Sequence, residues 1–562
     1  MRANPAPRVP WTWLYLAALV LLGVGIYWNA LHGPFLFDDL DIKEPQTSVR
    51  TGNWFAILTG PRPLLILSYA LNYELAGSRF REFDFHVVSL VLHIINAVLL
   101  WLLLRRLPGL PAAAVWGVPL LFLASPIQTE SVAYISSRSE LLAATFYLLA
   151  LLVFAGGWRE RRPWVVAALV GFCFGCSVTS KQHALTLPGA ILLVDYFFFA
   201  GRDWRNLRRN WRRNWPTYAV LGALLVTGGV VVVRMVLNAP SAGFSLKDVT
   251  WQDYLFTQFR MYWLYVRLLA IPFGLNADYD IAPSRTLWQH FSWLGLAGLV
   301  ALAVAVVRLR RRRPVEAFGA LFFLMTLFPS SSFYPLLDYA AERRLYLPSI
   351  GLFLAAVAAA SSRRLTVALA AATVICAAGT VARNRVWTDS LLLWQDTAEK
   401  SPRKWRAQAN LGRELSDRRR FPEAAAAYQK AAEYMPKDSP NRAEVLSSYG
   451  STLANQGRYA EAAEVYRKAL QDAPGHQRLW TNLGIAEIRL GRPEGWEKFE
   501  KAIHLDPVAW EPHMARANLY YQMKRYDEAI RDYERVLQLF PDHPDAQYNL
   551  KAAQAMKLRI RP

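Results

Sequence analysis

Apolar runs of membrane-spanning length fill the first two thirds of this 562-residue chain. They recur from about residue 12 to residue 381, and after Arg383 the sequence becomes charged and repetitive. The hydrocarbon core of a bilayer needs about 20 apolar residues per helix. The pattern therefore predicts an all-α protein with a polytopic membrane domain at 1–382, a linker helix at 383–405 and a water-soluble domain at 406–562.

About eleven of these runs are candidate spans. Several are shorter than the usual length, as happens in large bundles where protein rather than lipid covers the helix ends. The runs are 12–31, 86–104, 113–124, 139–155, 163–179, 183–200, 216–237, 291–307, 315–330, 345–360 and 365–381.

Arginine clusters predict the orientation of this domain. Eleven crossings that begin inside place six arginine-rich segments in the cytoplasm, and these hold 20 arginines against Glu160 and Asp203. This bias accounts for most of the net charge of +21, so membrane lipids rather than nucleic acid are the expected partners of the basic residues. The segments are Arg2 and Arg8, Arg105 and Arg106, 159–162, 202–213, 308–313, and Arg363 and Arg364.

One apolar stretch, 254–273, does not fit this orientation. It carries Arg260 and Arg267, and counting it as a crossing would move the 308–313 cluster to the outer side. We therefore expect an interfacial or re-entrant helix pair there.

Cysteines and short motifs offer no support for a metal site or a cofactor. Cys173, Cys176 and Cys376 all lie within apolar runs, which favours packing over a disulfide or a zinc site. Nucleotide-binding and hydrolase motifs are absent in credible contexts. The sequence predicts no cofactor and no metal-ligating residues, and it leaves a requirement for a divalent metal open.

The water-soluble part is built from repeats. Gly412, Ala424, Tyr428 and Pro436 recur as Gly450, Ala462, Tyr466 and Pro474, and related positions continue at spacings near 34 residues. Small residues allow paired helices to approach, and aromatic residues fill the groove between them. This is the tetratricopeptide repeat (TPR) pattern, with about four repeats, and it predicts an α-solenoid that binds a protein or peptide.

Two adjacent carboxylates open the first outer loop. Asp38 and Asp39 follow the first span in FLFDDLD, and Arg62 comes later in the same loop. A carboxylate beside water at a membrane rim suits a general base, and Arg62 is a candidate for substrate binding. The alternative is that both aspartates are solvated loop charges that end the first span.

The second outer loop, SPIQTESVAYISSRSELLAA, supplies Glu130 and Arg138. Glu130 is a candidate to assist the base or to bind the acceptor, and Arg138 is a candidate to hold a phosphate oxygen. In the structural alternative, Ser137 or Ser139 caps a helix and Glu140 lies in its first turn.

Cations in two further loops are candidates to bind a phosphate. Lys181 and His183 lie between two apolar runs, where the lysine either neutralises a phosphate or extends to the interface. Arg343 and Arg344 immediately precede a span on the outer side, against the positive-inside trend. Guanidinium groups suit a polyprenyl phosphate, and pairing with Asp338 or Glu342 is the alternative.

The order of the motifs resembles a known family. In sequence they are FDDLDI, RPLLILSYALNY, FHVVSLVLHIINAVLL, PIQTESVAYISSRSELLA, NADYD, AERRLYLPSIG and RNRVWTDSLLLWQD. Together they resemble the transmembrane-and-TPR O-mannosyltransferases and their bacterial relatives, members of the GT-C superfamily of glycosyltransferases. The likeness covers nearly the whole chain.

The resemblance implies a GT-C fold and a single inverting displacement. In it, a protein Ser or Thr hydroxyl attacks a polyprenyl-phosphate sugar, often mannose, and the TPR array presents the acceptor. The chain departs from the family at Ser125, where histidine is common, and in its small number of repeats, which bears on the acceptor. The matching positions are Asp38 or Asp39 as the base, Glu130 and Arg138 in the pocket, and Arg343 or Arg344 near the carrier phosphate.

Two functional hypotheses follow. The first is a membrane glycosyltransferase whose active site and TPR domain face the periplasm of a bacterial inner membrane, a location suggested by the Ala- and Arg-rich composition. The second is a non-enzymatic TPR scaffold or envelope-assembly factor, which has less need of so many spans. A transporter is a weaker third option because broken helices with buried midplane charges are not evident.

Overall fold

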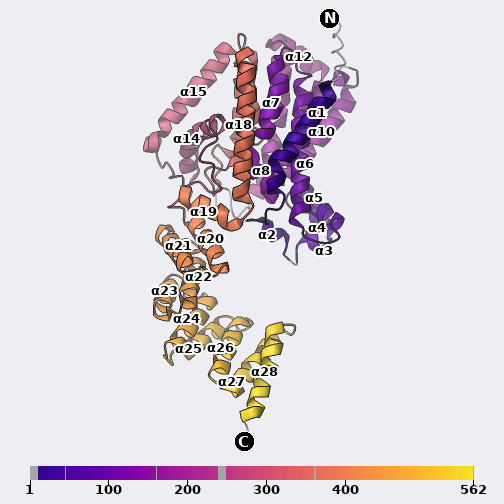
Figure 1. Ribbon diagram of the computed structural model, residues 1–562. Helices are drawn as coiled ribbons and strands as arrows, with labels where there is room; N and C mark the ends of the chain where they lie inside the picture. The colour runs from indigo at the N-terminus through magenta and orange to yellow at the C-terminus, as the bar shows by residue number, and fades with distance from the viewer. Residues whose placement is uncertain are drawn as a thin grey trace. The chain divides into compact units, whose positions relative to one another are not determined.

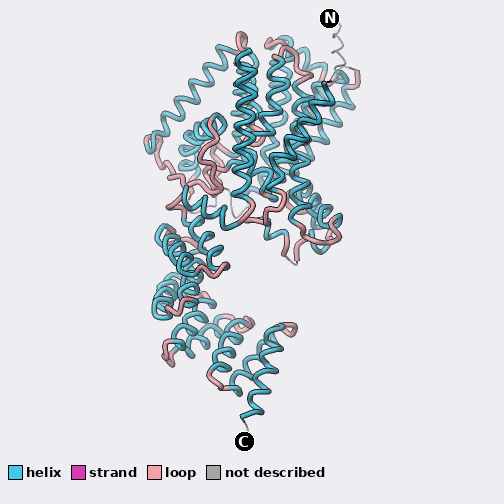
Figure 2. Tube along the Cα trace, in the orientation of Figure 1, coloured by secondary structure: helices cyan, strands magenta, loops and turns pink. Residues whose placement is uncertain are grey.

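The computed structural model describes residues 11–44, 46–159, 161–237, 243, 249–359 and 363–560. Within these residues the regular structure is helical and contains no strand (Figure 2). The chain divides into two compact units, Met1–Leu393 and Trp394–Pro562 (Figure 1). Arg2, Arg8 and Glu160, which belong to the arginine-rich segments above, lie outside the described residues.

Seven helices among the described residues are long and apolar enough to cross a membrane, which makes this an integral membrane protein. An eighth crossing results if the pair Ala112–Ala124 and Pro126–Ala133, bent by 51°, counts as one span. The seven are Trp11–Ala30 (α1, η1), Glu82–Leu104 (α6), Ile135–Ala155 (η3, α9), Pro163–Ser180 (α10), Gln182–Phe199 (η5, α11, η6), Gln289–Leu309 (η7, α15) and Val367–Trp387 within α18 (Arg363–Trp387).

The expected count of eleven spans is therefore not confirmed. The runs at 315–330 and 345–360 correspond to shorter apolar helices, Pro314–Ser330 and Ser349–Ala359. These helices bury much of their surface against the bundle, so the protein rather than the bilayer sets their length. The run at 216–237 forms α13 (Trp215–Leu237), whose last side chains lie outside the described set.

The stretch expected to form an interfacial or re-entrant helix pair is one continuous helix, α14 (Trp251–Ala270). It is not among the seven candidate spans. Thr250 caps its first turn by accepting a hydrogen bond from the backbone N–H of Asp253 at 3.1 Å. Because no proline or glycine interrupts it, nothing in the local sequence breaks this helix.

Shorter helices connect the spans of this unit. Segment 383–405 contains the end of α18 and all of α19, and the boundary between the units falls inside α19. The connecting helices and the remaining helices are α2 (Asp39–Ile42), α3 (Ser48–Thr51), α4 (Trp54–Thr59), α5 (Pro63–Leu75), α7 (Ala112–Ala124), η2 (Pro126–Gln128), α8 (Thr129–Ala133), η4 (Gly157–Arg159), α12 (Trp204–Arg213), α16 (Pro314–Leu327), η8 (Phe328–Ser330), η9 (Glu342–Leu345), α17 (Ser349–Ala359) and α19 (Ser390–Lys400).

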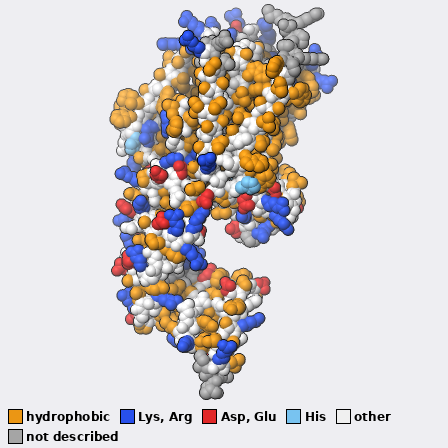
Figure 3. All heavy atoms as spheres, in the orientation of Figure 1, with side chains coloured by type: hydrophobic (Ala, Val, Ile, Leu, Met, Phe, Trp, Pro, Cys, Tyr) orange, Lys and Arg blue, Asp and Glu red, His pale blue; other side chains and the backbone are white. Residues whose placement is uncertain are grey.

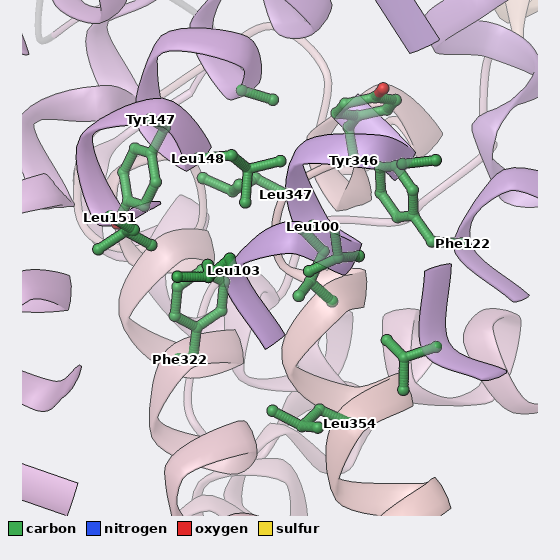
Figure 4. Packing of buried hydrophobic residues seen from close by; sticks show 14 of the residues in the cluster. Leu100, Leu103, Phe122, Tyr147, Leu148, Leu151, Phe322, Tyr346, Leu347 and Leu354 are labelled. Carbon is green, nitrogen blue, oxygen red and sulfur yellow. The ribbon is translucent and has the colours of Figure 1, made fainter. Parts of the chain in front are cut away.

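The bundle core forms where α6 packs against α7 and α9, and where α16 packs against α17. Figure 4 shows Leu100 and Leu103 of α6, Tyr147 of α9, Phe322 of α16 and Leu354 of α17 gathered in this cluster, and all five are buried. Apolar side chains also cover the flank of the unit in Figure 3, as expected of a surface in contact with lipid.

The second unit is an α-solenoid of four helix pairs and a final helix. Its glycines lie under aromatic rings: a Cβ on Gly412 would meet the ring of Tyr428, and a Cβ on Gly450 would meet the ring of Tyr466. These contacts explain the spacing that the sequence repeats. The helices are α20 (Trp405–Asp417), α21 (Phe421–Tyr434), α22 (Arg442–Asn455), α23 (Tyr459–Asp472), α24 (Gln477–Arg489), α25 (Gly495–Leu505), α26 (Glu511–Gln522), α27 (Tyr526–Leu539) and α28 (Pro544–Ile560).

Candidate active site

The two aspartates of the first loop occupy different environments. The side chain of Asp39 is fully buried, and its carboxylate accepts hydrogen bonds from the backbone N–H of Leu36 at 3.1 Å and from the N–H and hydroxyl of Ser136 at 2.7 and 2.5 Å. Asp38 is exposed. Burial raises the pKa of Asp39 to about 7, against the effect of these hydrogen bonds. Asp39 therefore anchors the loop, and Asp38 faces solvent.

The backbone before this pair adopts an uncommon conformation. Phe37 has a φ of 49°, in the left-handed region that bulky residues rarely occupy. Its ring packs against Tyr134, with the ring centroids 5.3 Å apart. The contact and the Asp39 anchor hold the strained turn, which presents Asp38 at the surface.

Tyr134 links the aspartates to the cations. Its hydroxyl oxygen accepts a hydrogen bond from the backbone N–H of Asp38 at 3.3 Å. Burial raises the pKa of the Tyr134 hydroxyl, the charges of Asp38 and Asp39 raise it further, and Arg343 opposes them. The hydroxyl therefore lies within electrostatic reach of both the acidic pair and Arg343. No sequence pattern singles out Tyr134, although it lies in the same block as Glu130 and Arg138.

Glu130 and Arg343 form an ion pair between distant parts of the chain. The Arg343 guanidinium donates to Oε1 of Glu130, and the Arg343 backbone N–H donates to Oε2 at 2.8 Å. Asp338 lies 3.6 Å from the same guanidinium. Two carboxylates raise the pKa of Arg343 against the opposing effect of burial. The side chain of Arg343 is still 26% exposed, so a ligand oxygen has access to it.

A second charged group gathers around Glu140. Its carboxylate pairs with Nζ of Lys181 at 3.1 Å and with Nδ1 of His183 at 3.3 Å. Burial lowers the pKa of Lys181 to about 8, Glu140 opposes this, and the positive charges of Arg62 and Arg343 lower the pKa further. Arg62, Lys181 and Arg343 therefore share one neighbourhood. Glu140 acts as a counterion here rather than as a first-turn helix charge alone.

Arg62 occupies the N-cap position before α5 with a φ of 53°, again in the left-handed region. Pro63 follows it at the first helical position, where proline is favoured. The side chain of Arg62 is half-buried and has no ion-pair or hydrogen-bond partner among the described residues. A cation held in a strained conformation beside Lys181 fits a role in ligand binding.

Two of the arginines predicted to bind a ligand instead form hydrogen bonds within the protein. Arg138 is fully buried, donates to Oδ1 of Asn72 at 3.0 Å and to the Phe85 carbonyl at 2.7 Å, and stacks over the Tyr69 ring. Arg344 donates to the Asp338 carbonyl at 2.7 Å and to the Tyr254 hydroxyl at 3.3 Å. Arg138 joins α5, α6 and α9, and Arg344 fixes the loop before η9.

Helix capping by Ser137 or Ser139, the structural alternative for this segment, does not occur. Ser137 occupies the N-cap of α9 without a side-chain cap bond, and the hydroxyl of Ser139 donates to the Ser136 carbonyl at 3.1 Å. For Arg343 and Arg344, the structural alternative is pairing with Asp338 or Glu342. Arg343 pairs with the Asp338 carboxylate at 3.6 Å, and Arg344 donates to the Asp338 carbonyl.

Glu342 forms a buried acidic centre beside this group. Its carboxylate accepts hydrogen bonds from the backbone N–H of Asn276 and from the Tyr279 hydroxyl, the latter at 2.9 Å. Burial raises the pKa of Glu342 to about 7; Arg383 opposes this and Glu130 adds to it. Glu342 thus ties the NADYD block to the Arg343 loop. No cluster of His, Cys, Asp and Glu that could hold a metal ion occurs within the described ranges.

Parts of the chain match known protein families. Residues 61–232 match the family described as dolichyl-phosphate-mannose-protein mannosyltransferase, and residues 409–477, 449–509 and 510–543 match tetratricopeptide repeats. The chain is 24% identical over 452 residues to protein O-mannosyl-transferase F38B6.6 of Caenorhabditis elegans, covering 75% of this chain and 63% of that protein.

Two mammalian relatives show the same relationship. Protein O-mannosyl-transferase TMTC4 of Homo sapiens is 25% identical, with 74% of this chain and 65% of that protein covered. TMTC3 of Mus musculus is 23% identical, with 95% and 64% covered. The chain is similar in sequence to the TMTC protein O-mannosyl-transferases. The expected family resemblance and the TPR repeats are therefore confirmed. The matches span less than two thirds of the length of these three relatives.

The matched family range covers only part of the candidate site. It contains Glu130, Lys181 and Arg62, whereas Asp38 and Arg343 lie outside it. The contacts described above bring the two sets together, because Glu130 binds Arg343 and the Tyr134 hydroxyl accepts from Asp38.

Proposed function

We propose that this protein transfers a sugar, mannose in the first instance, from a polyprenyl-phosphate carrier to a Ser or Thr hydroxyl of a protein. One observation carries the proposal: Asp38 is exposed next to the buried Asp39, which anchors the loop, and partly exposed cations lie nearby. The names of the relatives and the mannosyltransferase family match support the reaction class.

Asp38 is the proposed general base. Its exposed carboxylate takes the proton of the acceptor hydroxyl while the hydroxyl oxygen forms a bond to the anomeric carbon of the sugar. The bond from that carbon to the phosphate oxygen breaks, and the polyprenyl phosphate leaves with the electron pair. Asp39 is a positioning residue because its carboxylate is already occupied by Leu36 and Ser136.

The leaving phosphate needs positive charge, and the partly exposed cations supply it. Arg343 is 26% exposed, Lys181 is 21% exposed and His183 is 14% exposed. Arg62 lies close enough to lower the pKa of Lys181. We assign the phosphate to Arg343, Lys181 and Arg62, since guanidinium and ammonium groups stabilise phosphate oxygens in a partly dry site. Arg138 and Arg344 support this site without touching the donor.

The solenoid is proposed to bind the acceptor polypeptide, as TPR arrays commonly do. The proposed location is a bacterial inner membrane with the active site and the TPR unit on the periplasmic side. This side follows from the arginine clusters, which favour the cytoplasm.

The test is transfer of sugar from a synthetic polyprenyl-phosphate mannose to a Ser/Thr peptide by the purified full-length protein. We expect D38N to lower the rate by about 100-fold or more, the typical contribution of a general base. D39N should also lower the rate. It should in addition lower the thermal stability, because an amide has one acceptor oxygen and cannot accept from both Leu36 and Ser136 as the carboxylate does.

Asp41, in the same short helix, provides a matched control. D41N should retain transfer, because Tyr134 and Ser136 form their hydrogen bonds with Asp38 and Asp39 and not with Asp41 among the described residues. Full activity in a folded D38N protein would remove Asp38 as the base. Absence of any transfer or donor hydrolysis by the wild-type protein would favour the scaffold hypothesis.

A further inference from the structure

A second charged surface lies on α12, at the end of the membrane unit opposite α2 (Figure 1). The helix reads WRNLRRNWRR and connects the candidate span Gln182–Phe199 to α13. At 3.6 residues per turn, Trp204, Leu207 and Trp211 share one stripe, and the arginines occupy the adjoining side. Such an arrangement is typical of a helix that lies in the membrane interface.

The arginines of α12 are available to a ligand. Arg205, Arg208, Arg209 and Arg212 are exposed, and none of the four has a carboxylate partner among the described residues. The acidic residue nearest in sequence, Asp203, uses its carboxylate to accept the backbone N–H of Arg205 at 2.7 Å as the helix cap. Lys and Arg side chains gather at this end of the unit in Figure 3.

The tryptophans mark the depth of the helix. Trp204 is 66% exposed and Trp211 is 58% exposed, yet each ring leans on a tyrosine of the bundle. Trp204 lies 4.8 Å from the ring of Tyr196, and Trp211 lies 6.3 Å from the ring of Tyr218. Indole rings favour the headgroup level of a bilayer, so the stripe places the arginines beside lipid phosphates.

Buried hydrogen bonds hold α12 in this orientation. The carboxylate of Asp195, fully buried at the end of α11, accepts from Nδ2 of Asn210 at 2.8 Å and from the Tyr218 hydroxyl at 2.7 Å. Leu207 packs into the core beside them. A surface arginine on a mobile loop would lack this support. Here a buried network fixes the helix and therefore the positions of its guanidinium groups.

We propose that α12 is a built binding site for anionic phospholipid headgroups, with Arg208, Arg209 and Arg212 as the phosphate ligands and Trp204 and Trp211 as the interfacial anchors. The occupant is a structural phospholipid of the surrounding leaflet. The sugar donor is a different ligand, because the Asp38 loop lies at the other end of the unit (Figure 1). The proposal does not depend on the transferase activity.

The experiment counts phosphatidylglycerol retained by the purified full-length protein. Protein from nanodiscs of mixed phosphatidylglycerol and phosphatidylcholine is moved to mild detergent and examined by native mass spectrometry, then titrated with phosphatidylglycerol. We expect the wild-type protein to retain phosphatidylglycerol in preference to phosphatidylcholine. The triple variant R208Q/R209Q/R212Q should lower the apparent affinity by about 100-fold, since each of the three arginines near an anionic surface contributes about fivefold.

The matched control is R308Q/R311Q/R312Q, which removes the same charge from exposed arginines at the end of α15 and in the turn that follows. This control should keep its bound phosphatidylglycerol. Equal losses in both variants would overturn the proposal, because they would indicate net charge rather than a built site, and unchanged binding in the α12 variant would overturn it as well. Circular dichroism and gel filtration verify that both variants are folded.

N210A gives an independent test, because it removes the hydrogen bond to Asp195 that holds α12. This variant should weaken phosphatidylglycerol binding although it retains every arginine.

Discussion

Adjacent identical residues have different roles in this protein because burial separates them. Asp38 and Asp39 differ by one position, yet only Asp39 turns into the protein, where Ser136 and Leu36 bind it. The carboxylate of Asp38, the proposed base, is exposed. The buried one fixes the backbone that carries its neighbour.

Asp39 predicts a pH dependence of stability. Burial raises the pKa of Asp39 from 3.8 to about 7 in the folded protein. Between these values the folded state holds a proton that the unfolded state has released, so stability falls as the pH rises from about 4 to about 7. Glu342, whose pKa burial also raises to about 7, adds a slope of the same sign.

We therefore expect the melting temperature of the wild-type protein in detergent to decrease from pH 5 to pH 7. D39N should show a shallower decrease, and D39N/E342Q the shallowest. Differential scanning fluorimetry across this range provides the measurement. A steeper decrease in D39N than in the wild type would contradict the assignment of the raised pKa to Asp39.

The Glu130–Arg343 pair predicts a stability effect of its own. E130Q leaves the Arg343 guanidinium in a largely buried site with Asp338 as its remaining acidic partner, 3.6 Å away. We expect a loss of about 3 kcal/mol in unfolding free energy, as for other broken buried pairs. E316Q serves as the control, since Glu316 forms a looser pair with an exposed Arg313 at 4.0 Å and should show no measurable change.

At the scale of elements, one short segment organises the site. Residues 134–140 comprise Tyr134, η3 (Ile135–Ser137) and the start of α9 (Arg138–Ala155), and their polar groups reach several loops. Tyr134 bonds the Asp38 backbone, Ser136 bonds Asp39, and Glu140 bonds Lys181 and His183. A segment that follows the bend between α7 and α8 thus brings together loops that the sequence separates.

The contact of α16 with α17 depends on two glycines. A Cβ on Gly319 would meet the carbonyl oxygen of Gly351, and a Cβ on Gly351 would meet that of Gly319. Small residues allow this close approach of two helices in a membrane protein. Arg343 lies in η9, a few residues before α17, so the packing of this helix pair also positions Arg343.

We expect G351A to destabilise the protein by about 1–3 kcal/mol through overpacking. G175A in α10 is the matched control, because no atom lies within 4 Å of the added Cβ, and alanine there should stabilise the helix by up to about 1 kcal/mol. Thermal denaturation in detergent compares the two. Equal stability of G351A and the wild type would show that the helices can separate without cost.

At the scale of the whole molecule, the membrane unit and the solenoid each have their own core. The buried clusters of the two units do not share residues among those described. Each unit is therefore a separate target for mutation.

Removal of residues 394–562 should leave a folded membrane unit. If this unit is the enzyme, it should retain hydrolysis of polyprenyl-phosphate mannose and transfer to short peptides, and lose transfer to folded protein acceptors. The assays are thin-layer chromatography of the released sugar and mass spectrometry of the peptides. A folded, truncated protein without hydrolysis or transfer would support the scaffold hypothesis.

The sequence by itself determined the helical class, the order of a membrane part and a repeat part, and the loops that carry the polar chemistry. These follow from apolar run length and from the 34-residue period, which are local properties of the chain. Only the tertiary structure decided which polar side chains meet. Glu130 and Arg343 are 213 residues apart, Asp39 became the buried partner of Asp38, and Arg138 turned from a candidate ligand into a fully buried support. The packing of helices distant in the chain sets such contacts and such burial, and no local pattern encodes them.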